Sequence, residues 1–103
     1  TLADSLAALE CIRTSIDAPV LVVGPPAVDD DAQNRRLAEL DAALHESADH
    51  AGVPYVDLLT STSSSQLWRR EIASSDGYHP GAQGYEHLAR IITPEVLRWL
   101  RSL

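Results

Sequence analysis

The segment Asp76-Gly77-Tyr78-His79 combines two side chains that together suit general base catalysis. Histidine is the side chain that most readily exchanges a proton near neutral pH, but it works as a base only when something fixes its tautomer. A carboxylate that accepts a hydrogen bond from Nδ1 does this and leaves Nε2 free to take a proton from a nucleophile. Because Gly77 permits a sharp turn, the spacing predicts that Asp76 orients His79 as a general base.

A structural explanation of the same two residues stays open at this point. Asp76 can cap the helix that follows, and His79 can simply pack beside Pro80. The aromatic side chains on either side of the pair, Trp68 and Tyr78, either line a pocket for an acyl or aryl group or cover the core.

The other polar clusters favour structural roles. The run Thr60–Ser65 is interpreted as a surface loop, because no turn from a strand to a helix surrounds it to expose a nucleophile. His45 and His50 lie five residues apart, which does not place them on one face of a helix, so no metal site is expected. Asp57 is predicted to be an acceptor that organises a loop, in preference to a catalyst. Asn34 is predicted to lie at a helix start, with a functional polar group beside the cleft as the alternative.

The elements that hold these residues follow from apolar periodicity. Apolar residues at spacings of three and four predict a helix over 2–16, and the run Val20–Val23 predicts a buried strand. A second helix begins after the aspartates 29–31 and ends at Gly52, and Val53–Leu58 predicts a second strand. A short piece around 67–72 and a final helix after Gly81, interrupted at 93–94, complete an α/β pattern with a parallel sheet.

Composition limits the classes of partner. Fifteen acidic residues against eight basic ones give a net charge of −7, which disfavours nucleic acid and anionic membrane surfaces. The longest apolar stretch, Pro19–Val23, is far too short for a membrane span. Cys11 cannot form an internal disulfide, and its place between Leu9 and Ile12 predicts a buried thiol.

Several segments in the correct order resemble the SGNH (GDSL-type) hydrolases, a family of serine esterases and lipases. The run Asp76–Tyr85 before an apolar helix resembles the family's last block, Val20–Pro26 its fourth strand and turn, Asn34–Leu37 the start of the next helix, and Pro54–Leu58 its fifth strand. The resemblance implies a flavodoxin-like three-layer α/β/α fold and a Ser-His-Asp triad. In that triad His79 is the base and Asp76 its carboxylate.

The family's other catalytic motifs are absent from these residues. The nucleophile belongs to a Gly-Asp-Ser motif, and the oxyanion hole uses that serine's amide, a Gly and the Asn of a Gly-x-Asn-Asp block. Asp4-Ser5 lacks the preceding Gly and lies in a helical pattern. We therefore expect residues 1–103 to be the C-terminal half of one hydrolase domain, with about two strands and three or four helices, and to be inactive alone.

The expected partners are a small-molecule ester and either the missing N-terminal half or a second chain that covers the open edge of the first strand. No cofactor is expected. An alternative hypothesis is a complete small α/β binding or interaction module in which the Asp-x-x-His segment is structural.

Overall fold

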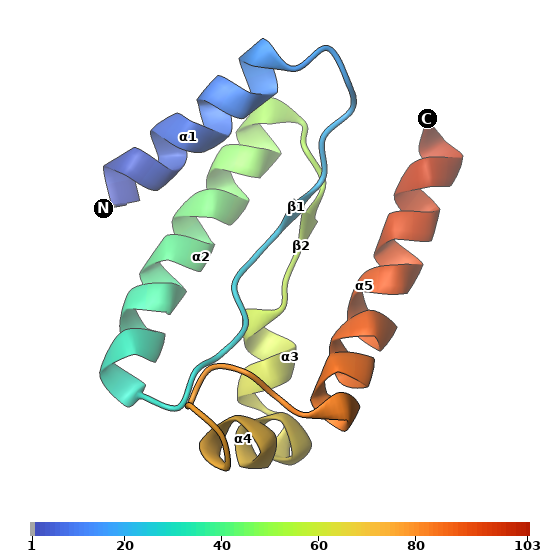
Figure 1. The fold of residues 1–103 in the computed structure, drawn as a ribbon. Helices are drawn as coiled ribbons and strands as arrows, with labels where there is room; N and C mark the ends of the chain where they lie inside the picture. The colour runs from blue at the N-terminus through green and yellow to red at the C-terminus, as the bar shows by residue number, and fades with distance from the viewer. Residues whose placement is uncertain (1) are drawn as a thin grey trace.

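The computed structural model describes residues 2–103, which form helices on both sides of a small parallel sheet (Figure 1). The helices of these residues are α1 (Leu2–Ser15), α2 (Asp31–Ala51), α3 (Leu59–Ser63), α4 (Gln66–Ala73) and α5 (Ala82–Ser102). The strands are β1 (Val22–Val23) and β2 (Tyr55–Val56). Helices α1 and α2 lie on one side of the strands and α5 on the other (Figure 1), which confirms a partial α/β fold.

The two strands run parallel, with Val22 opposite Tyr55 and Val23 opposite Val56. The N–H groups of Val22 and Gly24 donate to the carbonyls of Pro54 and Val56, each at 2.9 Å. Both strands are shorter than the apolar runs that predicted them. In the described residues β1 pairs only with β2, so only one side of β1 is held by a ladder.

Helix α2 begins and ends at the predicted signals. The Asp30 carboxylate accepts a hydrogen bond from the N–H of Gln33 at 2.8 Å, which caps the first turn. Gly52 follows the last turn with φ of 69° and donates to the carbonyls of Ala48 and Asp49. Local chemistry therefore fixes both ends of this helix.

The prediction of a surface loop over Thr60–Ser65 is wrong. This stretch contains α3 and the N-cap of α4, where the Ser65 hydroxyl accepts from the N–H of Trp68. Thr62 is fully buried, and its hydroxyl donates to the carbonyl of Leu58 at 2.7 Å. The hydroxyls of Thr62 and Ser64 donate to carbonyls four residues back, as hydroxyls inside a helix can. With α3, residues 2–103 hold five helices and not three or four.

Helix α5 also differs from expectation, because it runs through Thr93 and Pro94 without a break. Its half-buried positions include Leu88, Ile92 and Val96, so one apolar stripe continues past the proline. Among the described residues, no helix is long and apolar enough to cross a membrane.

The core lies mainly at the carboxyl ends of the strands. Its buried apolar residues are Leu9, Ala27, Ala48, Val56, Leu58, Trp68 and Ile72. The indole Nε1–H of Trp68 donates to the carbonyl of Ala27 at 2.9 Å, so Trp68 covers the core and does not line a pocket. Cys11, which was expected to be buried, is exposed on α1.

Candidate active site

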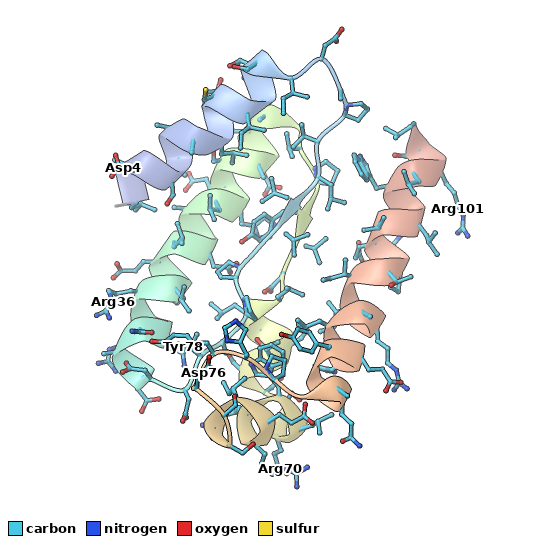
Figure 2. All side chains as sticks on the ribbon, in the orientation of Figure 1. Asp4, Arg36, Arg70, Asp76, Tyr78 and Arg101 are labelled. Carbon is cyan, nitrogen blue, oxygen red and sulfur yellow. The ribbon has the colours of Figure 1, made fainter. Side chains whose placement is uncertain are left out.

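Asp76 and His79 lie on the loop between α4 and α5, beside the carboxyl ends of the strands. Figure 2 shows Asp76 and Tyr78 on this loop, near the turn that leads into α2. The N–H of Gly77 donates to the carbonyl of Ile72, and the N–H of Asp29 donates to the carbonyl of Gly77, both at 2.9 Å. In open α/β sheets this edge is where ligands commonly bind.

The structure brings the two predicted residues into direct contact. Nδ1 of His79 lies 2.6 Å from Oδ2 of Asp76. The other carboxylate oxygen accepts the N–H groups of Tyr78 at 2.9 Å and His79 at 2.8 Å. Gly77 makes the turn with φ of 84°, in the region that favours glycine. One carboxylate thus shapes the loop and contacts the imidazole.

These hydrogen bonds hold the pKa of the Asp76 carboxyl well below its usual range. The N–H of His79 contributes most, followed by the imidazole of His79 and the N–H of Tyr78. Asp76 therefore stays ionised at neutral pH, and its carboxylate can accept a hydrogen bond from a protonated Nδ1 of His79. With Nδ1 engaged and the side chain 72% exposed, Nε2 of His79 is left accessible.

The turn between β1 and α2 is hydrogen-bonded to the loop of Asp76 and His79. Ala27 is held on both sides, since its N–H donates to the Thr62 hydroxyl at 2.8 Å and its carbonyl accepts from Trp68. The Asn34 side chain forms two hydrogen bonds with the backbone of Val28, because its Oδ1 accepts from the N–H at 2.9 Å and its Nδ2 donates to the carbonyl at 2.8 Å. Because α2 begins at Asp31 and is capped by Asp30, Asn34 lies in the first turn and does not cap the helix, but it fixes the turn that receives the loop.

Asp57 is a hydrogen-bond acceptor, as predicted, but it acts at the start of a helix and not in a loop. Its carboxylate accepts the N–H of Thr60 at 3.1 Å and the hydroxyl of Thr60 at 2.7 Å, which starts α3. Burial alone would raise the pKa of Asp57, but the bonds from Thr60, the N–H of Leu59 and the charge of His45 outweigh burial and lower the pKa.

The histidines of α2 lie apart from Asp76 and His79. His45 stacks on Tyr55 with ring centroids 4.8 Å apart, and His50 is exposed near the end of the helix. In residues 2–103 no group of three or more His, Cys, Asp or Glu side chains is placed to hold a metal ion.

A cavity of about 650 Å³ lies between α1 and α2, and Tyr78 of the His79 loop forms part of its lining. Its apolar lining comes from Leu2, Val28, Leu37, Leu40 and Tyr78. Ser5 also lines this cavity but belongs to α1, as its helical pattern predicted. The structure thus places Tyr78 against a hollow and Trp68 in the core.

The sequence of the chain matches the model of a known protein family. A sequence model of the GDSL-like lipase/acylhydrolase family matches residues 3–87. This chain belongs to the GDSL-like lipase/acylhydrolase family. No curated protein matches the chain.

Membership in the GDSL-like family confirms the resemblance to SGNH hydrolases and supports a hydrolase of this type. The matched residues include the Asp76–His79 loop and both elements that fix it, α4 and the turn after β1. Sequence reasoning found the local pair but missed Thr62, Asp29 and Ser75. The contacts of Thr62 and Asp29 join residues far apart in sequence. The Ser75 hydroxyl donates to the carbonyl of His79, four residues on, a bond that the spacing alone does not indicate.

Proposed function

We propose that this chain supplies the general base, His79, and its orienting carboxylate, Asp76, to a serine ester hydrolase. The observation that supports this most directly is the 2.6 Å contact between Nδ1 of His79 and Oδ2 of Asp76. The contact selects the tautomer with the proton on Nδ1, so that Nε2 presents a lone pair. A base needs that lone pair directed at the proton that it removes.

The chemistry is acyl transfer in two steps. Nε2 of His79 takes the proton of a serine hydroxyl as its oxygen attacks the ester carbonyl, and then gives the proton to the departing alcohol. In the second step Nε2 takes a proton from water as the water oxygen attacks the acyl-serine carbonyl. His79 then returns this proton to the serine oxygen, which restores the hydroxyl as the carboxylic acid departs. In both steps the Asp76 carboxylate stabilises the imidazolium that forms.

The nucleophile and the oxyanion donors come from another segment, because Gly-Asp-Ser and Gly-x-Asn-Asp are absent from residues 1–103. We assign these groups to an N-terminal half of the same domain and residues 1–103 to its C-terminal half. The 72% exposed His79 side chain fits a base whose serine approaches from a separate segment.

The open edge of β1 supports an N-terminal half as partner. The N–H groups of Val22 and Gly24 point toward β2, so those of Leu21 and Val23 point to the opposite edge. Val23 is 42% exposed. An unpaired edge with apolar side chains is a template for another strand, and the same observation disfavours a self-contained binding module.

The test is complementation. The chain is mixed with, or fused to, an N-terminal segment of a family member that bears Gly-Asp-Ser, and hydrolysis of p-nitrophenyl acetate is followed. We expect the chain alone to be inactive, the pair to be active, and His79→Ala to abolish the gain. His50→Ala, which removes an exposed histidine from the end of α2, is the matched control and should keep the gain. Equal turnover with and without His79 would show that another group is the base.

A further inference from the structure

Glu71 of α4 places its carboxylate at the first turn of α5. Its Oε1 accepts a hydrogen bond from the N–H of Gly84 at 2.5 Å. Gly81, the N-cap residue of α5, has no side chain with which to cap the helix. Glu71 therefore does this from another helix, satisfying one free N–H and placing a negative charge at the positive end of α5.

Gly84 makes room for the proline that follows His79. A Cβ at Gly84 would lie 2.3 Å from Cβ of Pro80 and 2.8 Å from Oε1 of Glu71. Pro80 thus sits directly against the first turn of α5, in contact with the residue that Glu71 holds. Because the proline ring fixes its own φ, a movement of this turn is passed to the backbone of His79.

Residues at the C-terminal end of α4 and just after it also hold the loop of His79 through hydrogen bonds. The Ser75 hydroxyl donates to the carbonyl of His79 at 2.5 Å. The N–H groups of Ser75 and Gly77 both donate to the carbonyl of Ile72, whose side chain is fully buried. The residues before His79 are therefore hydrogen-bonded to α4 at Ile72. Pro80, which follows His79, contacts Gly84 of α5, and Gly84 is hydrogen-bonded to Glu71 of α4.

We propose that Glu71 is a positioning residue for His79, acting through Gly84 and Pro80 to hold the imidazole against Asp76. Its importance for ester hydrolysis rests on the proposed function of His79. The positioning itself does not, since it is a property of the loop that can be measured without a nucleophile.

The test reads the imidazole of His79 in the ¹⁵N-labelled chain by NMR. In the unaltered chain we expect the tautomer with the proton on Nδ1 and a low-field Nδ1–H signal. Glu71→Ala should abolish that signal and shift the ring nitrogens toward the tautomer mixture of a free imidazole. Glu71→Gln keeps a side-chain oxygen for the N–H of Gly84 and should preserve the signal.

Glu86→Ala is the matched control, because it removes a carboxylate of α5 that pairs with Arg90 at the surface. Each spectrum is recorded well below the unfolding transition of its variant. Should Glu71→Ala fail to fold, Pro80→Gly removes both the Cβ that lies against Gly84 and the ring that fixes φ while leaving the Glu71 cap, and the same loss of signal is expected. A Glu71→Ala chain with a lower melting temperature but an unchanged His79 signal would reduce Glu71 to a helix cap and overturn the proposal, as would an unchanged signal in Pro80→Gly.

Discussion

Asp76 uses its two carboxylate oxygens for different purposes. Oδ1 accepts the N–H groups of Tyr78 and His79, and Oδ2 contacts the imidazole. An asparagine can keep the first set of bonds through its carbonyl oxygen, but its amide nitrogen cannot accept a proton from Nδ1. The backbone turn and the orientation of the imidazole are therefore separable by a single substitution.

Asp76→Asn is expected to lower kcat of the complemented enzyme by about 10⁴-fold, the size of effect seen when a triad carboxylate is replaced by its amide. The loop should keep its shape, so the backbone amide signals of residues 76–79 should change little. Steady-state kinetics with p-nitrophenyl acetate and an amide NMR spectrum measure the two effects. An Asp76→Asn enzyme with unchanged kcat would contradict the role of Asp76.

Acid should weaken the fold through Asp76. Its pKa is lower in the folded chain than the value of about 3.9 for an unfolded aspartate. Its contribution is therefore fully present above the unfolded pKa and is lost as pH falls through the folded one. Urea midpoints of the wild type and Asp76→Asn should differ at pH 6 and converge as pH drops below about 4. A difference that stays constant with pH would rule out this linkage.

Gly77 and Gly52 both adopt positive φ, of 84° and 69°, but only Gly77 belongs to the loop of His79. Gly77→Ala and Gly52→Ala should each cost roughly 1–2 kcal/mol of stability through backbone strain. Only Gly77→Ala should also weaken the low-field His79 signal, because the strain is relieved by moving Asp76 away from the imidazole. Thermal unfolding and NMR of both variants compare the two sites, and loss of the signal in Gly52→Ala would be unexpected.

At the scale of elements, the sequence predicts what short-range chemistry determines. Asp30 and Gly52 mark α2 because caps act within one turn. The run Thr60–Ser65 misleads because serine and threonine are frequent in loops, whereas here Thr62 and Ser64 donate to carbonyls four residues back. Thr62 is also buried against Ala27, a contact between residues 35 positions apart that has no local signal.

The same limit explains what could be predicted of the candidate site. Asp76, Gly77 and His79 act within four residues, so their spacing was enough to predict the turn and the contact. The supports of the loop, Glu71 and Asp29, were not predicted, because each reaches a residue that only the folded chain brings near.

Thr62→Val tests whether α3 holds the turn after β1. The substitution keeps the shape of the side chain but leaves the buried N–H of Ala27 without its acceptor, which should cost about 1–3 kcal/mol. Thr62→Ser retains the hydroxyl and should cost less. Urea unfolding of both variants gives the comparison. A Thr62→Val chain that is as stable as the wild type would show that the hydrogen bond to Ala27 does not hold the turn.

At the scale of the whole molecule, the chain exposes more surface than its size requires. Its accessible surface is 6632 Å², against about 5,700 Å² for a folded monomer of this mass. The radius of gyration is 14.5 Å, against about 13 Å for a compact domain of this length. The excess of about 900 Å² is close to what one partner buries in a standard interface.

The excess includes exposed apolar side chains on β1, on α5 and at Leu103. Val23, Leu97, Leu100 and Leu103 are each more than 40% exposed. A cavity of about 220 Å³ separates α5 from the strands and is lined in part by Leu21, Val56 and Trp99. A segment that adds a strand to β1 would extend the sheet beneath α5 and cover part of this surface.

Val23→Pro is designed to block the open edge of β1 without breaking the sheet. The N–H of Val23 faces away from β2, so proline removes only the hydrogen bond that an added strand would accept. The variant should stay folded but lose both binding of the N-terminal segment, measured by calorimetry, and the esterase activity of the pair. Val22→Pro is the matched control, because it removes the bond to Pro54 and should destabilise the chain itself.

The result also identifies what covers the edge. If Val23→Pro binds the N-terminal segment as tightly as the wild type does, that segment docks elsewhere and the β1 edge is not its site. If sedimentation shows instead that the wild-type chain forms dimers that Val23→Pro abolishes, the occupant is a second copy of this chain. Only loss of heterologous binding together with loss of activity supports a hydrolase whose two halves meet at β1, because only then does strand pairing bring a serine to His79.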